Sequence, residues 1–343
     1  MQHDQSPTAE GRQYPSLKIA GFGDINFSTT KRPEGARGFN LGQFVLHMTS
    51  ELSPRVTFFG EISFTARSDA GTGSPSAVGF NTEVERMIVR FDHSDYLKMS
   101  LGRYHTPINF WNTEYHHGQW LQTTIQRPEM VQFGGRFLPV HFVGALVEGI
   151  TPAGGLNLNY QAGVGNGRSS IISRAGDAGD SNGKRAFLAT LFVKPDAAYG
   201  LRVGGSAYAD TITLASGQEF EERIVTAHAA WQKEDPEVIA ELASVRHQQA
   251  GSSVATWSHA YYVQVAYRLP GRASRWKPYY RFDHVGVNAA DAVFTLVPRL
   301  DSSTLGVRFD LSLAAVKGEY RTWVRGPGSL RNHGGFFQMC FTF

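Results

Sequence analysis

The chain ends on a stretch in which apolar side chains recur at every second position: Gly335-Phe336-Phe337-Gln338-Met339-Cys340-Phe341-Thr342-Phe343. In an extended strand successive side chains point to opposite faces, so Phe337, Met339, Phe341 and Phe343 share one face. At the edge of a soluble sheet such a strand would recruit other chains. A closed barrel in a membrane avoids this, because the strand pairs on both sides and its apolar face meets lipid. The ending therefore predicts a transmembrane β-barrel.

The length and composition of the chain allow one large barrel. Its 343 residues contain no run of about 18 apolar residues, so the sequence predicts no membrane-spanning helix. The longest apolar stretch, from Phe137 to Val147, is too short and contains Pro139 and His141. Mean hydropathy is slightly negative. This agrees with a barrel, because the lumen and loops are polar and only the outward half of each strand need be apolar.

Charge and cysteine content narrow the cellular setting. The net charge of +3 is too small and too dispersed to predict nucleic-acid binding. A single cysteine, Cys340, allows no disulfide framework or cysteine-based zinc site within one chain, and low cysteine usage agrees with an oxidising compartment. The start, Met1-Gln2-His3-Asp4, is polar and lacks a signal peptide. We interpret the sequence as a mature chain of the Gram-negative outer membrane rather than a cytoplasmic protein.

Alternation and turn signals predict about sixteen strands, an even number as single-chain barrels require. They fall at about 17–27, 39–52, 56–66, 86–92, 97–101, 140–150, 156–165, 186–195, 200–210, 223–232, 237–247, 257–269, 276–285, 303–310, 313–323 and 334–343. The segment 237–249 also has helical spacing, with Val238, Ile239, Leu242 and Val245 apolar. A helix there is the alternative, and one strand pair would then be miscounted.

The connections alternate in length, as they do in membrane barrels. Those after even-numbered strands are short, for example Ser53-Pro54 and Asp235-Pro236. Those after odd-numbered strands are longer and rich in Gly, Ser and Asp, for example 68–79, 166–185 and 286–297. Short periplasmic turns and long outer loops follow this rule. Both termini are therefore predicted on the periplasmic side.

The longest connection, 105–135, is the third on the outer side. A loop of this length is usually functional. It contains Phe110, Trp111, Tyr115 and Trp120, and we expect such large aromatic side chains to be buried rather than exposed to water. Inward folding against the barrel wall would bury them and narrow the channel, so we predict a constriction loop. The candidate constriction residues are His105, Asn109, Trp111, Glu114, His116, Arg127 and Glu129.

Several motifs resemble the phosphate-selective porin family, also known as porins O and P. Leu101-Gly102-Arg103-Tyr104-His105-Thr106-Pro107 is similar to its Leu-Gly-aromatic segment that runs into Thr-Pro. Arg127-Pro128-Glu129-Met130 stands where the family has a short segment with Glu and Arg, and the stretch from Tyr160 to Gly167 resembles its strand ending in Asn-Gly. Glu241 matches an acidic residue of a late strand. A terminal Phe also resembles the closing strand that the insertion machinery of outer-membrane barrels reads. The resemblance, over about 15–343, implies a trimeric sixteen-stranded channel, and we take from it the architecture and pore function only.

If the apolar positions face lipid, the alternate positions line the pore. Basic side chains outnumber acidic ones there, and charge in a wide pore sets its ion preference. We therefore predict a mild anion preference. The alternative is that these charges pair with opposite charges on neighbouring strands and only stabilise the barrel wall. The predicted pore-lining residues are Arg55, Arg86, Arg90, Lys98, Arg268, Lys277, Arg281, Arg308, Lys317, Arg321, Glu61 and Glu241.

Catalytic and metal chemistry is weakly represented. Ser258-His259 and His93-Ser94 are adjacent pairs that point to opposite strand faces, and no Gly-Xaa-Ser-Xaa-Gly elbow stands in a strand-to-helix context. His105, His116 and His117 could offer imidazoles to a metal. Adjacent histidines do not share a strand face, however, and Glu114 is the nearest fixed carboxylate. We therefore predict no enzyme activity, no metal site and no cofactor.

These patterns together predict a closed antiparallel transmembrane β-barrel of about sixteen strands with an inward-folded third outer loop. The predicted organisation is a flexible segment, 1–16, followed by one barrel domain, 17–343. The predicted function is that of an outer-membrane porin, a passive diffusion channel. Its expected partners are lipid, small hydrophilic or anionic solutes and two further copies in a homotrimer. The alternative is a structural barrel that encloses or anchors a partner protein. A third possibility, a transporter of hydrophobic solutes, would need an N-terminal plug, which 1–16 is too short to form.

Overall fold

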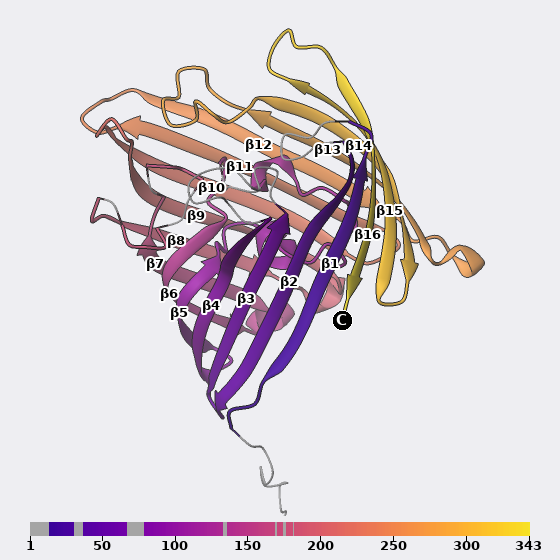
Figure 1. Cartoon of the computed structure of the whole chain (residues 1–343). Helices are drawn as coiled ribbons and strands as arrows, with labels where there is room; N and C mark the ends of the chain where they lie inside the picture. Colours follow the sequence, from indigo (N-terminus) through magenta and orange to yellow (C-terminus); the bar gives the residue numbers. More distant parts are fainter. Residues whose placement is uncertain are drawn as a thin grey trace, which may run out of the picture.

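The computed structural model describes residues 14–30, 37–66, 79–132, 136–168, 170–173, 176–180 and 182–343. Across these residues sixteen strands form one closed antiparallel ring in which each strand pairs with its chain neighbours and β1 pairs with β16 (Figure 1). They are β1 Lys18–Ser28, β2 Gly38–Ser53, β3 Val56–Ala66, β4 Phe80–Ser94, β5 Leu97–His105, β6 His141–Thr151, β7 Leu158–Asn166, β8 Arg185–Val193, β9 Leu201–Thr213, β10 Glu219–Gln232, β11 Glu237–Gln249, β12 Ala255–Ala266, β13 Trp276–Gly286, β14 Leu300–Leu311, β15 Ala314–Arg325 and β16 Asn332–Thr342.

The sixteen-stranded barrel predicted from the alternation is confirmed. Residues 237–249 form β11, which pairs along its whole length with β10 and over residues 237–248 with β12, so the helical alternative is wrong. Connections after even-numbered strands lie at the same end of the barrel as the start of β1 and the end of β16, and we call this the short-turn end. The opposite end is the long-loop end. The predicted long connection 68–79 lies, apart from Gly79, outside the described residues, as does most of the predicted flexible segment 1–16.

Each strand separates an apolar outer face from a polar inner face. On β10, Glu222 and Thr226 point inward and are buried, whereas Val225 points outward and is 57% exposed. Exposed Leu, Val, Phe and Met side chains recur on the outer face of most strands. Tyr96, Tyr199 and other exposed aromatic side chains lie towards the short-turn end. A continuous apolar band of this kind is unfavourable in water and suits a lipid environment. No helix in the described part of the chain is long and apolar enough to cross a membrane.

The ring closes where β16 pairs with β1. The register runs from Phe22 opposite Thr342 to Ser28 opposite Phe336. One residue beyond β16, the amide of Gly21 donates to the carbonyl of Phe343 at 2.9 Å, and the amide of Phe343 donates to the carbonyl of Gly21 at 3.1 Å. The Phe343 ring lies directly over Gly21, where a β-carbon would stand only 2.3 Å from it. The terminal aromatic residue therefore packs on a glycine at the seam.

The connection between β5 and β6 is the longest. It runs from 106 to 140, five residues further than the predicted end at 135, and contains α1, Phe110–Tyr115, and a single 3₁₀ turn, Glu129–Val131. In Figure 1 its purple coil lies within the ring of strands. We call residues 106–140 the third loop.

An apolar core occupies part of the barrel interior. The third loop contributes Phe110, Trp111, Met130 and Val131 to a buried cluster with inward side chains of β8 to β13, and the β13–β14 connection adds Phe294. Burial of each such side chain contributes about 1.5–3 kcal/mol. The loop is therefore held by packing as well as by the polar contacts described below.

Candidate functional site

The N-terminus of α1 is held by a carboxylate from the opposite wall. Glu241 on β11 accepts hydrogen bonds from the backbone amides of Phe110, at 2.6 Å, and Trp111, at 2.9 Å. The Tyr262 hydroxyl donates to the same carboxylate at 2.6 Å. The first amides of a helix have no partner within the helix, and the Asn109 side chain does not cap them. Glu241 supplies that partner, and the helix dipole stabilises its negative charge.

Three buried cations on β13, β14 and β15 hold the middle of the third loop. Arg281 donates to the Thr124 hydroxyl at 2.8 Å and to the carbonyls of Gln126, at 2.6 Å, and Arg127, at 3.1 Å. Arg308 donates to the carbonyls of Trp120, at 2.7 Å, and Gln122, at 2.9 Å. Lys317 donates to the carbonyl of Thr124 at 3.1 Å and to that of Gln119. We call Arg281, Arg308 and Lys317 the cation clamp.

Carboxylates of the wall hold loop amides between these cations. Glu319 accepts from the amide of Ile125 at 2.7 Å, and Asp283 accepts from the amide of Glu129 at 3.1 Å. The Glu129 side chain in turn pairs with Arg321. Loop and wall are thus joined by charge-assisted hydrogen bonds, which are stronger than neutral ones.

Two further ion pairs contribute to the contacts between the third loop and the barrel wall. Glu114 on α1 pairs with Arg202 on β9 at 2.6 Å. Lys277 on β13 pairs with Glu237 at 2.8 Å, and the Thr123 hydroxyl donates to the same carboxylate at 2.9 Å. Most of the predicted basic lining residues on β13 to β15 therefore point inward but contact the loop.

A cavity of about 370 Å³ remains on the opposite side of the interior, under the start of the third loop. Arg86 and Arg90 of β4 and Glu148 of β6 supply its charged lining, and His105, Pro107 and Thr113 border it from the loop side. A smaller cavity of about 180 Å³ shares Glu148 and Gln161 with it and includes Lys98. The polar space is therefore bounded by β2 to β8, away from the cation clamp.

The remaining predicted residues occupy supporting positions. Arg55, which we predicted to line the pore, instead lies exposed in the turn before β3. Arg268 lies in the turn after β12 and pairs with Glu234 and Asp310 at the short-turn end. Within the third loop the Arg127 guanidinium lies over the Trp111 ring, 5.1 Å from its centroid, and donates to the His116 carbonyl at 2.6 Å.

A β-bulge in β4 reverses the facing of part of the strand. Glu61 pairs with Arg86 but the next residue, Ile62, pairs with Val84, so Glu85 is the extra residue. The outward neighbours Val84 and Met87 are 50% and 57% exposed, whereas Glu85 is 4% exposed. A bulge redirects side chains in this way. Sequence alternation missed Glu85, because a strict period of two places it on the lipid face beside Arg86.

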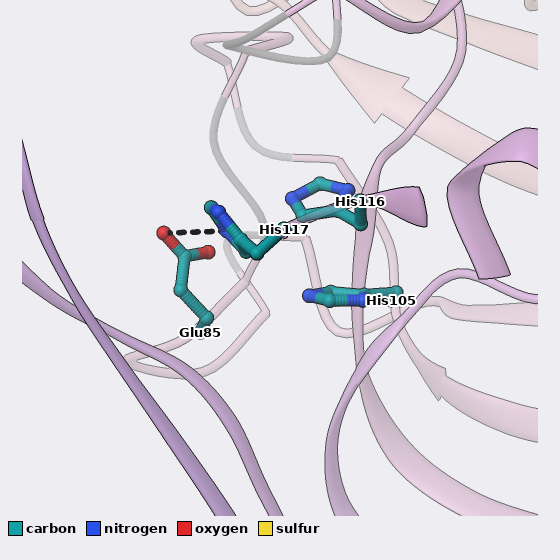
Figure 2. Close-up of side chains that lie close together, drawn as sticks. All are labelled: Glu85, His105, His116 and His117. Carbon is teal, nitrogen blue, oxygen red and sulfur yellow. Dashed lines mark ion pairs between the residues drawn. The ribbon is translucent and has the colours of Figure 1, made fainter. Parts of the chain in front are cut away.

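The bulge brings Glu85 to a group of buried histidines. His105 at the end of β5, His116 and His117 after α1, and Glu85 converge in Figure 2, and each offers one potential ligand atom, all within 4.8 Å of one another. We call these four residues, together with His141 at the start of β6, the histidine cluster. His116 and His117 do not face apart as predicted, because they follow a helix rather than lie in a strand. Glu114 is not the nearby carboxylate, since it pairs with Arg202.

Burial governs the ionisation of His116. Removal from water lowers its pKa well below the usual value, and the neighbouring His105, His117 and Arg127 lower it further by charge repulsion. The neutral imidazole, which has one lone pair, is therefore the stable form near neutral pH. A neutral imidazole is the form that coordinates metal ions.

Comparison with known proteins was made by sequence and by structure. No family model matches the chain, and no curated protein matches it in sequence. Among solved structures it resembles the outer membrane channel DcaP of Acinetobacter baumannii, at 10% identity over 96% of this chain and 97% of that chain, with a TM-score of 0.62. It also resembles OmpF of Salmonella typhi in complex with daunomycin, at 12% identity over 96% and 97%, with a TM-score of 0.62.

The trimer form of OmpT, an outer membrane protein of Vibrio cholerae, matches at 13% identity over 96% of this chain and 99% of that chain, with a TM-score of 0.58. Identities this low establish the fold, and function has to be argued from the site. The chain has the closed sixteen-stranded fold of the outer-membrane porins.

Proposed function

We propose that the protein is an outer-membrane channel for passive diffusion of small hydrophilic solutes. The observation that carries this proposal is the polar cavity under an anchored third loop, inside a closed wall whose outer face is apolar. A closed wall satisfies every strand edge, and a polar interior keeps a solute hydrated. No turnover chemistry or cofactor is needed for this role.

A mild anion preference remains the proposed selectivity. Arg86, Arg90 and Lys98 line the two cavities against Glu148 and Asp95, but Arg86 also pairs with Glu61 and Arg90 with Asp92, so the excess of positive charge is small. The cation clamp does not contribute to this balance, because its charges are committed to loop carbonyls. Selectivity for phosphate, which the family resemblance implies, would need a denser cationic site than these residues make.

Planar-bilayer recording of the purified protein tests the channel directly. We expect discrete conductance steps, and liposomes containing the protein should swell in small sugars faster than in large ones. A refolded, heat-modifiable barrel that conducts no ions and admits no sugar would contradict the proposal.

Substitution of Arg90 with Glu should change the ion preference. The reversal potential of the wild-type protein in a KCl gradient should show weak anion preference, and Arg90→Glu should shift it towards cations, because the local charge changes by two where ions pass. The matched control is Arg223→Glu on the outer face of β10, which should leave the potential unchanged. Cation selectivity in the wild-type protein would contradict the predicted preference.

A structural barrel is the second candidate. The third loop and Phe294 form an apolar core on the β8 to β13 side of the interior. This core leaves less space for solutes and favours a barrel that anchors a partner protein over one that conducts ions. This role predicts a barrel that forms in the membrane without conductance and that can be purified with a bound protein. A conducting barrel without such a protein favours the channel.

Location and assembly follow from the same proposal. We infer that the barrel lies in the outer membrane of a Gram-negative cell, with the short turns on the periplasmic side, because barrels with this distribution of turns and loops are arranged so. A homotrimer is the proposed assembly, since the OmpT structure is described as a trimer form. Analytical ultracentrifugation in a density-matched detergent would measure the oligomeric state.

A further inference from the structure

We propose that the histidine cluster binds a divalent transition-metal ion of borderline softness, represented by Zn²⁺, through imidazole nitrogens of His105, His116 and His117 and the carboxylate of Glu85. The site does not depend on the channel function. Such an ion would join the third loop, which supplies His116 and His117, to β4 and β5 of the wall.

The donor set suits such an ion. Three imidazoles and one carboxylate form a nitrogen and oxygen site of the kind that Zn²⁺ and its neighbours occupy, whereas Mg²⁺ and Ca²⁺ prefer all-oxygen sites. His117 Nε2 lies 3.1 Å from Glu85 Oε1. Two ligands about 2.0–2.1 Å from one tetrahedral ion are about 3.3 Å apart. This edge of the cluster therefore already has the required spacing.

The imidazole rings of the cluster lie close together. The ring centroids of His105 and His116 are 3.8 Å apart in a stacked arrangement, and those of His116 and His117 are 4.5 Å apart. His141 completes the group, with its Nε2 2.8 Å from Glu85 Oε2. The Glu85 carboxylate therefore lies between His117 and His141 at the edge of this group.

The hydrogen bonds around His116 fix which of its nitrogens carries the proton. The Asn112 side-chain amide donates to the carbonyls of Thr106, at 3.1 Å, and Val140, at 3.0 Å, so its oxygen must face His116. That oxygen lies 2.6 Å from His116 Nδ1, which is therefore the protonated nitrogen. The lone pair is then on Nε2. Orientation of a ligand by a hydrogen bond to its other nitrogen is the usual arrangement around protein-bound metals.

His117 and Glu85 are supported similarly. His117 Nδ1 lies 3.1 Å from the side-chain oxygen of Gln43, and its Nε2 faces Glu85. The Ser63 hydroxyl donates to Glu85 at 2.6 Å. Arg103 donates to the carbonyls of Val84 and Glu85, both at 2.6 Å, and so holds the bulge that turns Glu85 inward. His116, His117 and Glu85 are thus each preorganised by a separate partner.

The proposed site borders a cavity. His105 lines the cavity of about 370 Å³, so the cluster lies beside polar space rather than deep in the apolar core. Glu61, which pairs with Arg86, lies close by, with its Oε2 3.6 Å from His105 Nε2. Of the four proposed ligands, His105 is the one that an ion in this cavity would meet first.

Calorimetry on the refolded, chelator-treated protein in detergent tests the site, with Zn²⁺ as the ligand and elemental analysis for stoichiometry. We expect one ion per chain, bound in preference to Mg²⁺ and Ca²⁺. His116→Gln and Glu85→Gln should each weaken binding by about 100-fold, and Asn112→Leu by about 10- to 100-fold. With Co²⁺ as the probe, wild-type protein should show the intense visible absorption of a tetrahedral site.

The matched control is His93→Gln, an exposed histidine of β4, which should bind Zn²⁺ like the wild-type protein. Heat-modifiability on gels establishes that each variant has folded, and Asn112→Leu leaves all the ligands in place. Absence of stoichiometric binding in the wild-type protein would overturn the proposal. Equal affinity in the wild-type, His116→Gln and Glu85→Gln proteins would also overturn it, since the ion would then bind elsewhere.

Discussion

Replacing Arg281 with Met should release the third loop from the barrel wall and raise the conductance of the channel. The Arg281 side chain is fully buried, and it neutralises Asp283 at 2.9 Å while donating to two loop carbonyls and one hydroxyl. The loop carbonyls of Gln126 and Arg127 would lose their charged donor, and a buried polar group that loses its partner costs about 1–3 kcal/mol. Because each 1.4 kcal/mol is a factor of ten, the detached population should rise by more than about tenfold.

Two measurements detect the release. Bilayer recordings should show larger or more frequent open levels, and chymotrypsin should cleave the variant, but not the wild-type protein, at loop aromatic residues that become exposed on release. Arg223→Met is the matched control, because Arg223 is half exposed and pairs at 3.6 Å with the equally exposed Glu221. An Arg281→Met protein that conducts and resists protease like the wild-type protein would show that the other contacts hold the loop unaided.

Removal of residues 335–343 should abolish the barrel. This segment supplies most of β16, which pairs with β1 on one side and β15 on the other. Without it, both neighbours would expose unpaired amides and carbonyls to lipid, at a cost of several kcal/mol for each group. No rearrangement of fifteen remaining strands keeps an even, antiparallel ring.

Refolding into detergent or liposomes measures this effect. The truncated chain should lack the fast-migrating, heat-modifiable band and the protease resistance of the full chain. Leu330→Ser, in the connection between β15 and β16, is the control, since that side chain is 87% exposed and should leave folding unchanged. A truncated chain that still forms a resistant barrel would contradict the role of the seam.

The strands of the barrel wall could be predicted from the sequence because the side-chain pattern of each strand depends only on residues close together in the chain. Alternation of side chains along each strand is imposed by lipid outside and polar space inside, so residues such as Val225 and Thr226 reveal their facing directly. The same regularity fails at Glu85. A single inserted residue shifts the period, and no motif in the surrounding sequence distinguishes a bulge from a continuous strand.

The interior could be predicted only in part. Charge at inward positions identified Arg281 and Lys317 as facing the lumen, but their partners are carbonyls of a loop more than 150 residues away. Because every residue type has a backbone carbonyl, the sequence of the loop does not show which of its residues accept these hydrogen bonds. The approach of His116 to Glu85 likewise depends on α1 and on the bulge together, and neither could be placed from spacing alone.

The cation clamp holds the loop largely by its peptide oxygens, and this has a consequence for how the protein can change. Substitutions in the side chains between Gln119 and Arg127 leave those oxygens in place, so the path of the segment can persist while its chemistry diverges. The contacts between the wall and the third loop therefore tolerate substitutions of these loop side chains. Evolution or protein engineering could change the solute selectivity through such substitutions without altering the residues that anchor the loop.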